Sequence, residues 1–344
     1  MKRLLLIVVS LAILGGLGAA AWVYRSLEQP FRGYPEPELF VEIPSGSSTT
    51  SMARKLADAG VVPSPTAFAA AVWIRKAGRR LQAGEYRFDR PATPFEVVDR
   101  LAGGDVYLRS ITFREGLTIR QMSQLFEEKG FGTAAQFVAA AANADRIRHL
   151  DPGARDLEGY LFPNTYALPR RATAETLVAR MVGEFEKTAS EALRERAAAR
   201  GLSLRQLVTL ASIVEKETGM ADERPTVAAV YSNRLKIGMG LQCDPTVIYA
   251  LERAGRYDGN LRRSDLAFDS PYNTYRYAGL PPGPIAAPGR ASLEAAANPP
   301  DVPYLYFVSR NDGSHAFAAT LDEHNRNVQK FQVEYFRAKR LQAR

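Results

Sequence analysis

The stretch LFVEIPSGSSTTSMARKLADAG, residues 39–60, combines the two patterns that define the fold class. Its first residues alternate as in a strand, and the alternation breaks at the proline–glycine segment 44–46. Apolar residues then recur at helical spacing over 49–60, with Ser48 or Thr49 as the expected N-cap. A strand followed directly by an amphipathic helix predicts an α+β protein.

The segments that follow continue this pattern. A second helix is expected at 64–78, a strand at 81–88 and a third helix at 93–104. We therefore predict a small strand–helix–helix–strand subdomain over 39–105. The rest of the chain is expected to form a helix-rich α+β domain over 106–344. It begins with another strand, glycine turn and helix from Tyr107. Further helices are predicted at 133–145, 173–200, 203–218 and 223–236, before an irregular last 85 residues with one strand at 304–310.

The N-terminus carries a long uncharged segment. Residues 4–24 contain no charged side chain, and about 20 apolar residues are enough to cross a bilayer core. Lys2 and Arg3 before this run favour a cytoplasmic N-terminus. The alternative is a cleaved signal peptide, because small residues at 18–21 would suit a protease, but the apolar run is longer than usual for one.

We therefore expect an uncleaved transmembrane anchor over residues 1–25. The proline-rich segment 26–38 reads as a short linker. On either interpretation of the N-terminus, residues 26–344 lie outside the cytoplasm.

Composition and residue patterns limit which binding partners, metals and disulfides the protein can have. The net charge is +8, which suggests an anionic neighbour or simply an arginine-rich solvated surface. The sequence has no helix-turn-helix, zinc-spacing or RNA-binding aromatic pattern, so nucleic acid is not expected as a partner. Cys243 is the single cysteine, which excludes an intramolecular disulfide. His315 and His324 are too few ligands for a typical zinc site, and we expect neither a metal nor another cofactor.

Two carboxylates at the end of one apolar run are the first candidates for chemistry. In LVTLASIVEKETG, residues 207–219, Glu215 and Glu217 follow the buried stripe. At ~100° per residue they point about 200° apart, so one cleft cannot hold both. Either both are solvated surface acids, or one lies in an apolar groove with a raised pKa and acts as a general acid. Periodicity does not decide between them.

Three further segments combine polar and aromatic side chains. The segment 155–166 offers aromatic faces and amides that suit sugar rings, although it also reads as a core strand. The loops at 241–250 and 270–285 hold polar side chains between prolines and glycines, as binding rims often do, although Asp244 could be a plain helix N-cap. The segment 313–328 holds histidines that could brace a cleft. The candidate binding residues are Glu158, Tyr160, Asn164, Tyr166, Glu215, Gln242, Asp244, Asn273, Tyr275, His315 and Asn325.

Several long motifs, in the same order, resemble one known family. They are LEGYLFPNTY, LASIVEKETG, ER at 223–224, VYSNRLKIGMGLQCDPTVIYAL, SPYNTYRYAGLPPGPIAAPG, AAANP, YLYFV and HAFAATLDEHN. Over nearly the whole chain they resemble the endolytic murein transglycosylases, known as MltG or YceG-like proteins.

The resemblance implies an enzyme that cleaves the β-1,4 bond between N-acetylmuramic acid and N-acetylglucosamine in nascent peptidoglycan. It implies a 1,6-anhydro product formed without water, and Glu217, the second glutamate of the E-K-E triplet, as the essential acid. It also implies a LysM-like region at 39–105, a periplasmic catalytic domain on the inner membrane and membrane-bound peptidoglycan synthases as partners.

Two residues depart from the pattern of this family. Asn164 stands where many relatives have an acid, so that position cannot supply a second carboxylate. Cys243 stands where a hydroxyl residue is common, which argues against a catalytic thiol. Two other functions stay open: a non-catalytic glycan-binding or scaffold protein of the envelope, and an ordinary muramidase, which needs a second carboxylate.

Overall fold

The computed structural model describes residues 2–342. By its internal contacts the chain divides into two compact units. The N-terminal unit comprises residues 1–110 and 167–171, and the C-terminal unit comprises residues 111–166 and 172–344. Helices predominate, and the described residues form three two-stranded sheets. The α+β class predicted from sequence is confirmed.

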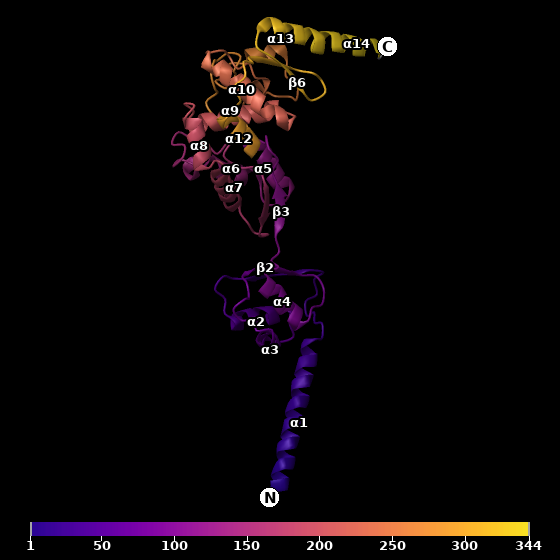
Figure 1. Ribbon diagram of the computed structural model, residues 1–344. Helices are drawn as coiled ribbons and strands as arrows, with labels where there is room; N and C mark the ends of the chain where they lie inside the picture. The colour runs from indigo at the N-terminus through magenta and orange to yellow at the C-terminus, as the bar shows by residue number, and fades with distance from the viewer. Residues whose placement is uncertain (1, 343–344) are drawn as a thin grey trace. The chain divides into compact units, whose positions relative to one another are not determined.

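The N-terminal unit contains the expected strand–helix–helix–strand order. Strand β1 pairs antiparallel with β2, with Leu39 opposite Phe88, and α2, α3 and α4 gather on one side of this sheet (Figure 1). Val41 and Tyr86 point into the core between the sheet and these helices. Ser48 is the N-cap of α2, as predicted. The elements are α1 (Lys2–Leu27), β1 (Leu39–Ile43), α2 (Thr49–Asp58), α3 (Pro65–Ile74), β2 (Gly84–Phe88) and α4 (Pro94–Gly103).

Helix α1 covers residues 2–25 of the segment predicted as the membrane anchor. Several of its side chains, including those of residues 2–6, lie outside the described part of the structure. Within the described part, no helix combines the length and the apolar character needed to cross a membrane. The anchor and the LysM-like character of 39–105 stay predictions.

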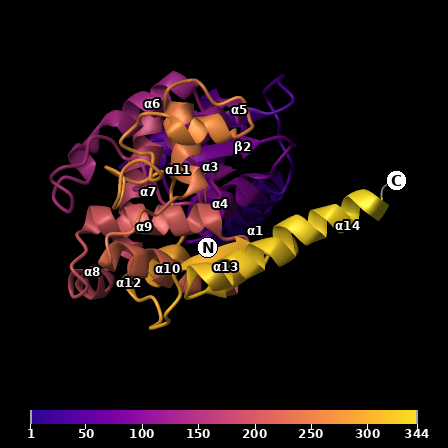
Figure 2. The same ribbon diagram turned by 90° about the horizontal axis from the view of Figure 1, so that it is seen from above.

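The C-terminal unit is built around α9, which is buried from Leu207 to Val214. Helices α9, α10 and α12 lie side by side (Figure 2). Strand β3 pairs with β4, and β5 pairs antiparallel with β6. The residues of β3 (Arg109–Thr112) and of β4 (Thr165–Leu168) are divided between the two units. The other elements are α5 (Ile119–Glu128), α6 (Ala134–Ala142), α7 (Ala174–Thr188), α8 (Glu191–Ala198), α9 (Leu204–Glu217), α10 (Arg224–Lys236), α11 (Asp244–Arg253), α12 (Arg290–Ala297), β5 (Tyr306–Ser309), β6 (His315–Ala318), α13 (Leu321–Val328) and α14 (Tyr335–Gln342).

One sequence-based prediction in this unit is wrong, and another is confirmed only in part. The helix expected at 173–200 is two helices, because α7 ends at Thr188 and the Ser190 side chain caps a new helix, α8. In the last 85 residues, the segment 268–289 is irregular and β5 lies within the strand expected at 304–310, as predicted, but α12, β6 and two C-terminal helices were not expected. Strand β6 is only four residues long, and its pairing with β5 is a contact that a local pattern does not reveal.

Candidate active site

Helix α9 carries both candidate glutamates in its last turn. Ser203 caps its first turn, with Gln206 completing a capping box. The middle of the helix is buried from Leu207 to Val214. Glu215 and Glu217 follow this buried part, and they point to different sides of the helix, where each meets different residues. Those surroundings distinguish the two carboxylates.

Glu215 is committed to structural contacts. Its carboxylate lies 3.2 Å from the Arg224 guanidinium and accepts hydrogen bonds from the Gly289 amide at 3.0 Å and the Ser292 hydroxyl at 2.7 Å. The side chain is 6% exposed. Glu215 therefore ties α9 to the starts of α10 and α12, and its oxygens are already engaged by protein donors.

Glu217 has fewer partners. The Tyr231 hydroxyl donates to its Oε1 at 3.0 Å, and the residue is half-buried. Burial raises the pKa of Glu217; hydrogen bonds from Cys243 and Tyr231 oppose that rise, and the charge of Asp244 adds to it. A carboxyl with a raised pKa keeps its proton closer to neutral pH, as a general acid must.

The two groups that contact Glu217 are themselves buried and neutral. Burial raises the pKa of the Tyr231 hydroxyl and of the Cys243 thiol well above their ordinary values. Cys243 therefore acts as a hydrogen-bonding thiol and is unsuited to be a nucleophile. Sequence reasoning missed Tyr231 as a functional residue, although it lies in the motif VYSNRL that supported the family resemblance.

Asp244 and Tyr275 form a second contact near Glu217. The Tyr275 hydroxyl donates to Asp244 Oδ1 at 2.6 Å. Asp244 is the first residue of α11, and Cys243 occupies the N-cap position without a side-chain cap, so the N-cap alternative for Asp244 is wrong. Asn273 is fully buried and holds the loop that carries Tyr275 through bonds to backbone groups. Gln242 is exposed, and its backbone N–H donates to the Thr274 carbonyl at 3.2 Å.

His315 is held by an acid from the turn before α10. Its Nδ1 lies 2.6 Å from Glu223 Oε2, and its backbone amide donates to Glu223 Oε1 at 2.9 Å. The imidazole packs edge-on against Phe307. The charge of His315 lowers the pKa of Glu217 and so partly offsets the effect of burial. Glu223 was missed as a site residue, although the dipeptide ER at 223–224 was among the matching motifs.

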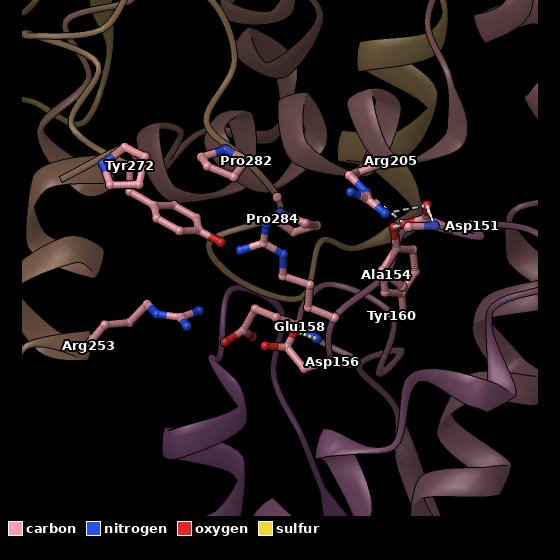
Figure 3. A pocket seen from close by; sticks show the side chains of 14 residues that line it. Asp151, Ala154, Asp156, Glu158, Tyr160, Arg205, Arg253, Tyr272, Pro282 and Pro284 are labelled. Carbon is pink, nitrogen blue, oxygen red and sulfur yellow. Dashed lines mark hydrogen bonds and ion pairs between the residues drawn. The ribbon is translucent and has the colours of Figure 1, made fainter.

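Glu158 lies in a separate group of residues. Its carboxyl accepts the Ile119 amide at 3.0 Å and contacts the Tyr249 hydroxyl at 3.2 Å. Burial raises the pKa of Glu158 to about 8, so the group is mostly neutral at pH 7. Glu158 lines a hollow shown in Figure 3, whose lining does not include Glu217.

The remaining candidates are dispersed. Tyr160 and Tyr166 are buried, and their hydroxyls donate to Asp151 and to the Phe162 carbonyl. Asn164 is exposed beside β4, and Asn325 is exposed on α13. The structure thus brings Glu217 together with Asp244, Tyr275 and His315 through direct or charge contacts, and among the described residues these four candidates form no hydrogen bond with Glu217.

The described residues contain no group of three or more histidine, cysteine, aspartate or glutamate side chains arranged to hold a metal ion. The expectation of a metal-free site therefore stays a prediction, to be tested by removing metals in solution.

Comparison with known proteins gives consistent matches. The model of the YceG-like family matches residues 41–330. A Bacillus subtilis (strain 168) protein named endolytic murein transglycosylase is 34% identical over 92% of this chain and 91% of its own length. A Streptococcus pneumoniae (strain D39) protein of the same name is 29% identical over 94% of this chain, which spans 63% of that protein. A crystal structure of a YceG-like protein from Listeria monocytogenes is 31% identical, with a TM-score of 0.58 over 84% of this chain and 98% of that one.

Proposed function

The chain belongs to the YceG-like family, and from that membership we propose that it is an endolytic murein transglycosylase whose acid is Glu217. The observation that carries the assignment of the acid is the contrast between the two glutamates of α9. Glu215 is bound by Arg224, Gly289 and Ser292, whereas Glu217 keeps a raised pKa and has few partners.

The proposed reaction uses this one carboxyl twice. Protonated Glu217 gives its proton to the bridging oxygen as the bond from C1 of the muramic acid to that oxygen breaks. The 6-hydroxyl of the same muramic acid then forms the new bond to C1, and its proton returns to the Glu217 carboxylate. Protons balance, no water is consumed, and the product carries a 1,6-anhydro ring.

The neighbours of Glu217 suit this cycle. Hydrogen bonds from Tyr231 and Cys243 favour the carboxylate that exists between the two proton transfers. The attacking hydroxyl is tethered to the reacting sugar, so it gains the large advantage of an intramolecular reaction. A second carboxylate to activate water, which ordinary glycosidases require, has no task in this scheme.

We also propose which residues contact the glycan. Asp244 and Tyr275 are joined by a hydrogen bond, and they offer a carboxylate and an exposed aromatic ring near the acid. His315, braced by Glu223, and exposed Gln242 complete the proposed contacts. The other candidates from the sequence stay predictions.

The location proposed for the enzyme rests on its N-terminal sequence. Residues 4–24 carry no charge, and Lys2 and Arg3 precede them. A single-pass anchor with a cytoplasmic N-terminus would hold the LysM-like segment 39–105 and the catalytic domain in the periplasm. There it would act on glycan strands emerging from membrane-bound peptidoglycan synthases.

One assay separates the candidate functions. The purified full chain in detergent is incubated with isolated peptidoglycan, and released fragments are analysed by mass spectrometry. Fragments with 1,6-anhydro ends support the proposal. Reducing ends would instead identify a hydrolytic muramidase. Binding to peptidoglycan without any released fragment would identify a glycan-binding scaffold.

A further inference from the structure

A hollow in the C-terminal unit is not used by the proposed reaction. It has a volume of about 110 Å³ and lies between the segment 151–160, the end of α11 and the loop prolines 282 and 284. In Figure 3 the Arg253 guanidinium points into this space toward Glu158. A second hollow of about 300 Å³ shares Asp156, Glu158 and Arg253 with the first, so the two form one binding region around these side chains.

The arginines of this region differ in how they are paired. Arg205 forms two hydrogen bonds with Asp151, at 2.9 and 2.7 Å, so its charge is neutralised. Arg155 and Arg253 also line the first hollow, and neither has a carboxylate within salt-bridge distance among the described residues. Two guanidinium groups therefore remain available to an anion.

The acids of the region do not cancel this positive charge. Asp151 forms a salt bridge with Arg205, and Glu158 is mostly neutral at pH 7. The remaining carboxylates are Asp156, which lines both hollows, and Glu252, which lines the second, where Arg120 adds a further positive charge. With Arg155 and Arg253 present, the balance favours a ligand that carries a carboxylate.

Aromatic rings hold Arg253 in a defined position. Its guanidinium lies 5.7 Å from the Tyr249 ring centre and 5.5 Å from that of Tyr272, and it donates to the Tyr249 hydroxyl at 3.2 Å. A guanidinium held in this way loses little side-chain freedom when it binds a carboxylate through two hydrogen bonds.

Two helices run from the surroundings of Glu217 to this region, and their rise sets the scale of the separation. Asp244, whose charge acts on Glu217, begins α11, and Arg253 ends it. Nine residues of helix rise about 14 Å. Arg205 and Glu217 similarly stand twelve residues apart on α9, a rise of about 18 Å. The loop that presents Tyr275 beside Asp244 also supplies Tyr272 to the hollow.

We propose that this region binds the carboxylate-bearing end of the peptide stem attached to the muramic acid at the cleavage site. The inference rests on the proposed function, because it assumes that the substrate is murein. A stem of about four or five residues spans roughly 13 to 18 Å when extended, which matches the separation along α11 and α9. Stem recognition would then position the sugar at Glu217.

Calorimetric titration of the full chain in detergent tests the proposal. The ligands are a murein disaccharide with its tetrapeptide stem, the same disaccharide without the stem, and the free tetrapeptide. We expect the stem-bearing disaccharide to bind about tenfold or more tightly than the stem-free one, as charge-assisted hydrogen bonds would produce. Equal affinities for the two disaccharides would overturn the proposal. So would free tetrapeptide binding as tightly as the stem-bearing disaccharide, since a site for free peptides needs no glycan.

Substitutions in the hollow test whether it causes the preference for the stem-bearing disaccharide. Arg253→Met should remove the preference for the stem and leave binding of the stem-free disaccharide unchanged. The matched control is Arg256→Met, because Arg256 also lies over an aromatic ring, that of Phe268 at 5.1 Å, but lines neither hollow. If Arg253→Met unfolds, exposed Arg155→Met provides the same test. Loss of affinity for both disaccharides alike would refute a stem-specific role.

The cleavage assay separates this inference from the proposed function. If peptidoglycan yields anhydro ends but the stem has no effect on binding, the stem site fails and the enzyme assignment stands. If the stem strengthens binding but no anhydro ends appear, the reaction assignment fails and the binding site stands.

Discussion

The buried carboxyl of Glu158 should make the stability of the C-terminal unit depend on pH. Burial raises its pKa from the ordinary 4.5 to about 8. The folded protein therefore keeps a proton that the unfolded chain releases between these two pH values. The stabilisation is complete below pH 4.5, declines as pH rises toward 8 and levels off above 8.

The substitution Glu158→Gln isolates this effect. Glutamine keeps the shape, still offers an oxygen to the Ile119 amide and can donate to the Tyr249 hydroxyl oxygen, but it does not ionise. At 1.36 kcal/mol per pH unit, the three units from pH 5 to pH 8 correspond to a change on the order of 4 kcal/mol. The free energy of unfolding of the variant minus that of the wild type should rise by this order over that range.

Urea unfolding at pH 5, 6, 7 and 8, followed by far-ultraviolet circular dichroism, measures the difference. Tryptophan fluorescence is unsuitable, because Trp22 and Trp73 both belong to the N-terminal unit. The matched control is Glu128→Gln, a substitution of an exposed glutamate on α5. A flat difference between Glu158→Gln and wild type from pH 5 to pH 8 would refute a protonated, buried Glu158.

Four further outcomes concern the reaction. Glu217→Gln should lower turnover ~10²- to 10⁴-fold without unfolding the protein; turnover above a tenth of wild type would exclude Glu217 as the acid. Tyr231→Phe removes a hydrogen bond that lowers the pKa of Glu217, so the alkaline limb of the kcat/KM profile should move to higher pH, and a shift to lower pH would contradict the assigned role. Deleting residues 1–25 should preserve cleavage of isolated glycan but abolish function in the cell; full complementation by an exported form would show that anchoring is dispensable. Exhaustive dialysis against a chelator should leave activity unchanged, whereas loss of activity that a divalent ion restores would replace the metal-free mechanism.

The sequence by itself determined the features that depend on neighbouring residues. The strand–helix–helix–strand order over 39–105 followed from alternation, helical spacing and Ser48, all acting within a few residues. The extent of α9 followed in the same way from its apolar stripe and the Ser203 cap. The α+β class and the family resemblance were therefore readable before the fold. The break at Ser190 was missed because the apolar pattern of 173–200 concealed a new N-cap.

Only the tertiary structure decided how the charged groups differ from one another. Periodicity left Glu215 and Glu217 equivalent, because both flank the same buried stripe. Glu215 is distinguished by Gly289 and Ser292, more than 70 residues along the chain, and Glu217 by Tyr231, on a different helix. A pKa depends on burial and on distant donors and charges, so its value follows from the packed fold and not from local sequence.

The region around Glu158 also shows the difference between what the local sequence indicates and what the folded structure determines. Its motif, LEGYLFPNTY, was evident in the sequence, but the pattern fitted both sugar-binding aromatics and a core strand. In the fold Tyr160 turns into the core, while Tyr249, 91 residues from Glu158, reaches its carboxyl. Arg253 adds its charge from the last turn of the same helix as Tyr249. Helix packing brings these side chains to one hollow, and this juxtaposition exists only once the chain has folded.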